Sequence, residues 1–189
     1  MKQIYLIRHG ETEWNRLNKM QGSKHDIPIN NTGKEQALYT GKYLHDYVLK
    51  KKDFDLVISS PMKRAKETAQ IISKEIDYDI CAIKYYDELI ELDDDILTDI
   101  IISRIEKIIY IIKTSIENKF FIIVHSRIIN SIINILFNIP NMPVDNTYGK
   151  NCTITYITYD NMIDKFNMIR MANTFHFALY NKNYNIDKK

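Results

Sequence analysis

The sequence predicts a three-layer α/β/α sandwich around a mostly parallel central sheet. Short apolar stretches typical of buried strands alternate with longer stretches whose apolar residues recur every three or four positions, as on one face of a helix. This alternation indicates parallel strands that are joined by crossover helices and covered on both faces. The length of 189 residues fits one domain. We expect that domain to span residues 1–180, followed by a polar tail over residues 181–189.

The first strand is expected over residues 3–8, where apolar side chains dominate. A loop rich in Asn, Gly and Pro follows over residues 10–31. Thr32, with Glu35 three residues later, forms a capping-box pattern, so a helix is expected to begin there. Its apolar face starts at Ala37.

The second strand is expected over residues 55–59. Ser60 precedes Pro61, which is the order of an N-cap residue followed by a proline in the first helical turn. The helix predicted from this start has apolar residues at steps of three and four, namely Met62, Ala65, Ala69, Ile72 and Ile76.

The rest of the chain continues the alternation. The expected strands are residues 81–84 (the weakest), 120–124, 153–158 and 165–171. The expected helices are residues 97–116 and 128–136, the second with Asn130 and Asn134 on the side away from its apolar stripe.

Composition excludes several classes of protein. The net charge of +2 gives no electrostatic reason to expect nucleic acid or membrane partners. Two cysteines form no disulfide framework and favour a reducing, cytoplasmic location. No apolar run is long enough to span a bilayer. Most basic residues are lysines, so each arginine invites a specific explanation.

Charged groups follow the ends of three expected strands. Arg8 and His9 end the first, Arg64 lies in the helical turn after the second, and His125 follows the strand over residues 120–124. Ligands of parallel sheets bind beyond the carboxyl ends of the strands. If these strands are neighbours, two arginines and two histidines therefore meet at one edge of the sheet.

Such a group of side chains suits a phosphate dianion. Arginine binds phosphate oxygens through two parallel hydrogen bonds, and helix N-termini add backbone donors. One histidine can attack phosphorus as a nucleophile while the other stabilises charge on the equatorial oxygens. A carboxylic acid must protonate the leaving alcohol, and Glu91 is the candidate, with Glu88 as the alternative. The scheme needs no cofactor, and the sequence has no metal-ligand spacing.

The stretch Leu6-Ile7-Arg8-His9-Gly10-Glu11-Thr12-Glu13-Trp14-Asn15 resembles the Arg-His-Gly motif of the histidine phosphatase, or phosphoglycerate mutase-like, superfamily. The resemblance is closest to its small phosphatase branch. It continues through Gln21-Gly22, Gly33 with Gln36-Ala37, Ser59 to Ala65 with Thr68-Ala69, Val124-His125, Asn151 to Ile154, and Asn173 to His176.

This resemblance implies a phosphoglycerate mutase-like fold and a role for each matching residue. His9 would be the phosphohistidine nucleophile and Glu91 the proton donor, which then serves as base for water. The remaining catalytic residues would be Arg8, Arg64 and His125. The expected substrate-binding residues are Arg8, Asn15, Arg64, Thr12, Gly22 and Ser126.

The sequence departs from the family pattern at two places. Ser126 and Arg127 follow the second histidine, where the family usually has glycine and often another small residue. The segment between Glu91 and His125 is short, which indicates a reduced lid region and an open site. The same changes are also compatible with decayed activity.

The leading hypothesis is a metal-independent phosphatase that hydrolyses phosphomonoesters. The alternatives are a phosphoglycerate mutase and a catalytically weak phospholigand-binding regulatory protein on the same fold. We expect a small-molecule phosphoester as partner, leaving open a phosphoprotein substrate and a homodimer. Of the remaining residues, His25 and His45 are expected at the surface, His176 in packing and Arg104 in a salt bridge.

Overall fold

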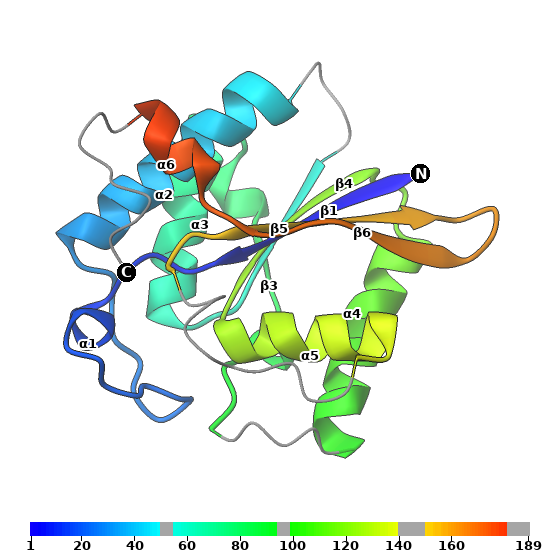
Figure 1. The fold of residues 1–189 in the computed structure, drawn as a ribbon, viewed down its shortest axis with the longest axis horizontal. Coiled ribbons are helices and arrows are strands. Elements are labelled where there is room, and N and C mark those ends of the chain that lie inside the picture. Colours follow the sequence, from blue (N-terminus) through cyan, green and yellow to red (C-terminus); the bar gives the residue numbers. More distant parts are fainter. Residues whose placement is uncertain (50–54, 94–98, 140–149, 181–189) are drawn as a thin grey trace.

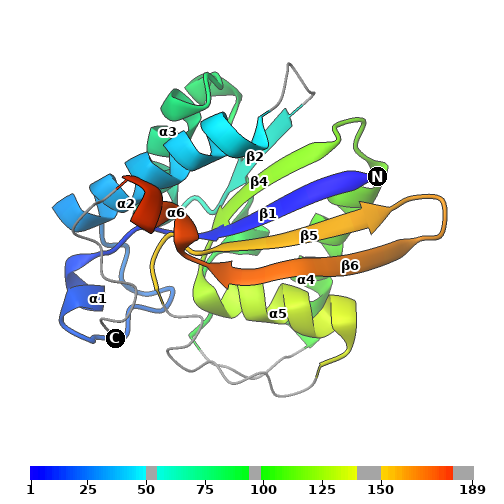
Figure 2. The same cartoon turned by 45° about the horizontal axis from the view of Figure 1, so that its top comes forward.

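A six-stranded mixed sheet forms the centre of the molecule (Figure 1). The computed structural model describes residues 1–49, 55–93, 99–139 and 150–180. The strands are β1 (Lys2–Arg8), β2 (Asp55–Ser59), β3 (Lys84–Tyr85), β4 (Lys119–Val124), β5 (Ile154–Asp160) and β6 (Lys165–Asn173). Their order is β3-β2-β4-β1-β5-β6. The first four are mutually parallel, and β5 and β6 extend the sheet as an antiparallel hairpin (Figure 2).

Helices cover both faces of this sheet, which confirms the predicted sandwich. On one face lie α2 (Asn31–Tyr43), α3 (Lys63–Glu75) and α6 (Phe175–Tyr180), and on the other lie α4 (Asp99–Thr114) and α5 (Ser126–Phe137) (Figure 1). A π-helical turn, η1 (Leu44–Val48), continues α2. Short elements complete the described fold: α1 (Glu13–Arg16), η2 (Ile80–Ala82) and η3 (Asp87–Leu89).

The two faces of the sheet bury separate cores. In β1, Ile4 and Leu6 pack with the residues of α4 and α5, whereas Tyr5 and Ile7 pack with those of α2 and α3. Successive side chains of a strand point to opposite faces, so a strand covered on both sides is apolar throughout. This is why the strands over 3–8, 55–59 and 120–124 could be recognised from the sequence.

Two helix starts differ from their predictions. The side chain of Asn30, not of Thr32, accepts a hydrogen bond from the backbone N–H of Gly33 and caps α2. In α3 the N-cap position is Met62 rather than Ser60. Because Met62 has no capping oxygen, Asp26 accepts the bond from the N–H of Lys63, at 2.6 Å.

The predicted helices and strands in the later part of the chain are present, with local differences in their bounds and exposed faces. Residues 81–84 form part of η2 and the first residue of β3 instead of one strand. Ile116 is exposed beyond the end of α4, and Asn130 is buried on α5 rather than facing away from the core. The expected helix start at Leu97 and the tail over 181–189 lie outside the described residues. Within the described part of the chain, no helix has the length and apolarity needed to cross a bilayer.

Strand register brings the predicted functional residues together. Arg8 of β1 is paired with Val124 of β4, and Ser59 of β2 is paired with Ile123. These parallel strands therefore end at the same edge, with His9, Ser60 and His125 immediately beyond it.

Candidate active site

Backbone hydrogen bonds fix the three strand ends to one another. The N–H of His9 donates to the carbonyl of Val124 at 2.9 Å, and the N–H of Ser60 donates to the carbonyl of Ile123 at 3.0 Å. The N–H of Cys152 reaches the carbonyls of Arg8 and His9 from the other side. These hydrogen bonds therefore fix the relative positions of the backbones of His9, Ser60 and Cys152.

His9 is buried and held in one orientation. Its Nδ1 lies 2.8 Å from the carbonyl oxygen of Gly10. Because a carbonyl only accepts, Nδ1 carries the proton and Nε2 keeps its lone pair. Burial is the main cause that lowers the pKa of His9 well below its ordinary value, and the charges of Arg8 and Arg64 add to it. A neutral ring with a fixed Nε2 lone pair is what a nucleophile at this position needs.

Gly10 allows the backbone after His9 to pass close to α2. A Cβ on Gly10 would lie 2.5 Å from the carbonyl oxygen of Gly33, so no side chain fits there. The N–H of Gly10 donates to Oγ1 of Thr68, whose hydroxyl in turn donates to the carbonyl of Arg64. The Arg-His-Gly motif is thereby connected to the first turns of α3.

His125 lies beside His9, with ring centroids 5.3 Å apart. Its Nδ1 accepts a hydrogen bond from Nε of Arg64 at 3.2 Å, and its Nε2 lies 2.9 Å from Oγ of Ser60. A guanidinium only donates, so the ring is neutral and Nε2 carries the proton. Burial, followed by the charge of Arg64, lowers the pKa of His125 well below its ordinary value.

Arg64 is buried on the first turn of α3, and hydrogen bonds from all three of its guanidinium nitrogens hold the group in one orientation. Besides His125, it donates to the carbonyls of His25 at 3.1 Å and Gly22 at 2.9 Å. Arg8 is the second guanidinium of the site, and burial lowers its pKa to about 10, which leaves it charged at neutral pH. Both positive charges and both neutral rings lie at the same end of the sheet.

Glu91 provides a carboxyl group next to His125. Its Oε2 lies 3.9 Å from Nδ1 of His125, and its side chain is 10% exposed. Oε1 accepts a hydrogen bond from the N–H of Leu92 at 3.0 Å. Burial raises the pKa of Glu91, while this hydrogen bond and the charges of Arg64, Arg127 and Arg8 oppose the rise. A carboxyl whose pKa is raised toward neutrality suits a general acid.

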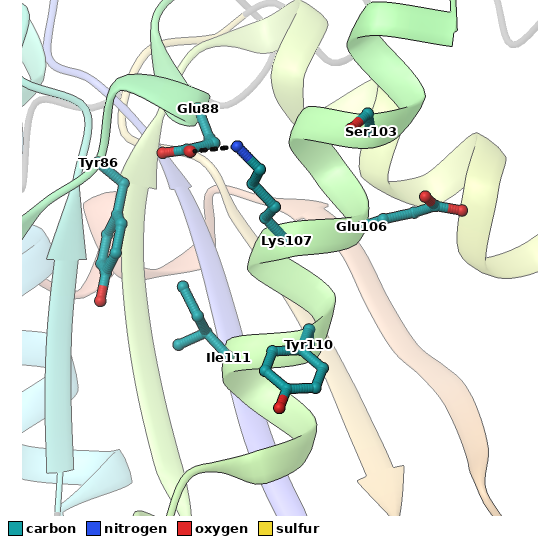
Figure 3. Close-up of a pocket in the computed structure, with 7 residues that line it drawn as sticks. All are labelled: Tyr86, Glu88, Ser103, Glu106, Lys107, Tyr110 and Ile111. Carbon is teal, nitrogen blue, oxygen red and sulfur yellow. Dashed lines mark hydrogen bonds and ion pairs between the residues drawn. The ribbon is translucent and has the colours of Figure 1, made fainter.

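Glu88, the alternative acid, faces another part of the surface. Figure 3 shows it pointing from η3 to Lys107 of α4, at the edge of a groove that also contains Tyr86 and Tyr110. A backbone hydrogen bond, followed by the pairing with Lys107, holds the pKa of Glu88 below its ordinary value. Glu88 therefore has neither the position nor the protonation of a proton donor, and the structure favours Glu91.

Thr12 and Asn15 form the capping box of α1. Oγ1 of Thr12 accepts from the N–H of Asn15, and Oδ1 of Asn15 accepts from the N–H of Thr12, both at 3.1 Å. The Nδ2 of Asn151 donates to the same oxygen of Asn15 and to the carbonyl of His9. Asn151 thus joins the backbone of His9 to the side chain of Asn15.

Gly22 lies in the loop that covers Arg64. It has φ of +56°, in the left-handed region, and a Cβ there would lie 2.2 Å from Oδ1 of Asp93. Asp93 also accepts hydrogen bonds from the N–H and hydroxyl of the next residue, Ser23. The segment after Glu91 therefore supports the loop whose carbonyls orient Arg64.

Ser126 begins α5 directly after His125 and lines a small cavity together with Asn130 and Thr153. Arg127 is partly buried and donates to the carbonyl of Leu92 at 3.0 Å. The prediction of a salt bridge for Arg104 is wrong. Arg104 instead donates hydrogen bonds to the backbone carbonyls of Glu88 and Ile90.

The three remaining histidines lie as predicted. His25 and His45 are exposed. His176 is buried, packs against Phe177 and forms a hydrogen bond with Oγ1 of Thr40. These contacts leave His176 in the packing of α6 against α2.

Two residues of the site were missed by sequence reasoning. Ser60 was interpreted as a helix cap, although its position just beyond β2 was a signal, because ligand sites lie there in parallel sheets. Asn151 was noted within a motif but given no role. Among the described residues, no three His, Cys, Asp or Glu side chains gather as potential metal ligands.

The fold and the site define an α/β protein with two arginines and two buried histidines gathered at the carboxyl edge of its sheet. The sequence model of the histidine phosphatase superfamily (branch 1) matches residues 4–95. This match covers just under half of the chain, which therefore resembles members of this superfamily, as its motifs predicted, and is similar in sequence or fold to phosphatases and phosphoglycerate mutases.

Individual relatives support this placement. The chain is 49% identical over 74 residues to the "Uncharacterized phosphatase PhoE" of Bacillus subtilis, a match over 39% of this chain and 35% of that protein. It is 36% identical over 97 residues to the "Probable phosphoglycerate mutase GpmB" of Salmonella choleraesuis, over 51% of this chain and 41% of that protein. These matches therefore span less than half of each relative's length.

The fold likeness extends beyond these matched segments. The crystal structure of a phosphoglycerate mutase from Bacillus anthracis superposes with a TM-score of 0.75, covering 94% of this chain and 95% of that one, at 18% identity. The shared fold thus includes elements that follow residue 95 and lie outside the family match.

Proposed function

We propose that the protein is a metal-independent phosphatase that hydrolyses phosphomonoesters through a phosphohistidine on His9. The observation that carries the proposal is the neutral His9 ring, whose Nδ1 is committed to the Gly10 carbonyl and whose Nε2 is left as nucleophile. Arg8 and Arg64 supply the positive charge that a phosphate dianion requires, without a metal ion.

In the first step, Nε2 of His9 attacks phosphorus and the bond from phosphorus to the alcohol oxygen breaks. The proton of the Glu91 carboxyl passes to that oxygen, which leaves as an alcohol. The guanidiniums stabilise charge on the equatorial oxygens, and so does the Nε2–H of His125, which exchanges its hydrogen bond with Ser60 for one to a phosphoryl oxygen when substrate binds. In the second step, Glu91 takes a proton from water as the water oxygen attacks phosphorus. The bond to His9 breaks and inorganic phosphate forms.

The experiment compares the wild type with His9→Ala and Glu91→Gln on p-nitrophenyl phosphate, in the presence of EDTA. We expect turnover in the wild type and its loss in His9→Ala. Labelled substrate should leave an acid-labile phosphoryl group on the wild-type chain. Full activity of His9→Ala, or activity that EDTA abolishes, would contradict the proposal.

The name of the Salmonella relative keeps a mutase as the second candidate. A mutase would interconvert phosphoglycerates faster than it hydrolyses them. The same preparation should therefore be tested with 3-phosphoglycerate, with and without a bisphosphorylated primer. A weak phospholigand-binding protein would instead bind vanadate or phosphate without turning over either substrate.

A further inference from the structure

Arg127 lies at the start of α5, two residues after His125, and extends to the segment that holds Glu91. Its Nη1 donates to the carbonyl of Leu92 at 3.0 Å, and its Nη2 contacts Sδ of Met20 at 3.9 Å. The N–H of the same Leu92 donates to Oε1 of Glu91 at 3.0 Å. Leu92 therefore connects the two side chains, since its carbonyl accepts from Arg127 and its N–H donates to Glu91.

A second arginine holds the other side of Glu91. Arg104, from α4, donates to the carbonyl of Ile90 and also to that of Glu88. The residues immediately before and after Glu91 are thus bound by guanidiniums from two different helices. Since residues 90–93 form no strand or helix, these bonds add to the burial of Leu92 in fixing where the carboxyl group lies.

We propose that Arg127 is a positioning residue for Glu91, which holds the proton donor at the leaving-group side of the phosphoryl site. This inference rests on the proposed function. It also gives a role to the departure from the family pattern after the second histidine, because a small residue at position 127 could not reach the Leu92 carbonyl.

Charge adds to the effect of geometry. The groups that face Glu91 are Arg8 from β1, Arg64 from α3, Arg104 from α4, and His125 and Arg127 from α5. Arg127 is among the charges that lower the pKa of Glu91 against the larger effect of burial. Removing its charge should raise that pKa and shift the alkaline limb of kcat/KM upward, since the first step needs a protonated carboxyl.

The test uses two substrates that differ in their need for a proton donor. The nitrophenolate of p-nitrophenyl phosphate leaves without help, whereas the alkoxide of β-glycerol phosphate must be protonated. For Arg127→Met we expect kcat/KM to fall about tenfold on β-glycerol phosphate and to change little on p-nitrophenyl phosphate. The alkaline limb should move to higher pH.

Arg127→Lys should recover most of the loss, because an ammonium keeps both the charge and a donor for Leu92. Arg170→Met, on the exposed surface of β6, is the matched control and should behave as the wild type. Equal losses on both substrates, or no loss on β-glycerol phosphate, would overturn the role of Arg127. His9→Ala is measured in parallel. If turnover depends on His9 but not on Arg127 as expected, only the role of Arg127 is overturned. If turnover does not depend on His9, the proposed function itself fails.

Discussion

The Nε of Arg64 donates a hydrogen bond to Nδ1 of His125 at 3.2 Å. This contact fixes the neutral tautomer of His125 and directs its remaining proton to Ser60. The guanidinium is more than a simple positive charge, because its other two nitrogens, Nη1 and Nη2, donate hydrogen bonds to the carbonyls of His25 and Gly22.

Arg64→Lys should therefore reduce kcat/KM for p-nitrophenyl phosphate on the order of a hundredfold, although the charge is kept. An ammonium cannot reach His125, Gly22 and a phosphoryl oxygen in the planar arrangement of a guanidinium. Steady-state kinetics on the purified variant checks this. Lys74→Arg, an exposed exchange in the last turn of α3, serves as control. A near-wild-type rate for Arg64→Lys would place Arg64 outside the phosphate site.

Asn151→Ala should lower kcat about tenfold or more and leave the midpoint of thermal unfolding nearly unchanged. The side chain holds both the carbonyl of His9 and Oδ1 of Asn15, so its loss frees the nucleophile and the substrate contact together. Asn161→Ala in the exposed turn between β5 and β6 is the matched control. Equal kcat values in the two variants would show that Asn151 has no positioning role.

Gly22→Ala should destabilise the protein by about 1–3 kcal/mol, because alanine is strained at φ of +56° and its Cβ meets Asp93. Urea unfolding measures the free energy. Adding Asp93→Ala removes the steric contact but not the strained φ, so the double variant should recover only part of the loss. Full recovery would mean that φ contributes nothing.

Acidification should destabilise the protein through its buried histidines. Burial lowers the pKa of His176 to about 4, below the ordinary value of 6.5. The unfolded chain therefore binds a proton that the folded chain does not, and stability falls as the pH drops from about 6.5 toward 4. The contribution of one such group has a slope of up to about 1.4 kcal/mol per pH unit.

In His176→Gln the free energy of unfolding should depend less steeply on pH, because one group that binds a proton on unfolding is gone. Urea unfolding between pH 7 and pH 4 measures this. His45→Gln is the control: its partner Asp46 raises the pKa of this exposed histidine, so no such flattening is expected. Identical pH dependence in His176→Gln and the wild type would contradict the assignment of a neutral, buried His176.

Much of the fold and the central site residues could be predicted from the sequence. The strands over residues 3–8, 55–59 and 120–124 are apolar throughout because both their faces are covered, and their ends carry Arg8, His9 and His125. Once the strands are taken as parallel neighbours, the meeting of these groups follows from topology. The expected roles of the site residues remain predictions.

The tertiary structure decided which competing local interactions form. Asn30 displaced Thr32 as the cap of α2 since it could reach Gly33, and Ser60 binds the ring of His125, 65 residues away, instead of capping α3. Likewise, the sequence favoured Glu91 as the proton donor and kept Glu88 as the alternative, but only tertiary contacts distinguish the surroundings of the two carboxyl groups. They are three positions apart in the chain, but Lys107 of α4 binds Glu88, whereas Glu91 lies beside the buried ring of His125. The local sequence pattern thus determined the helices, the strands and the types of side chain at the strand ends. Long-range contacts determined the hydrogen-bond partner of each polar group, because those partners lie far away in the sequence.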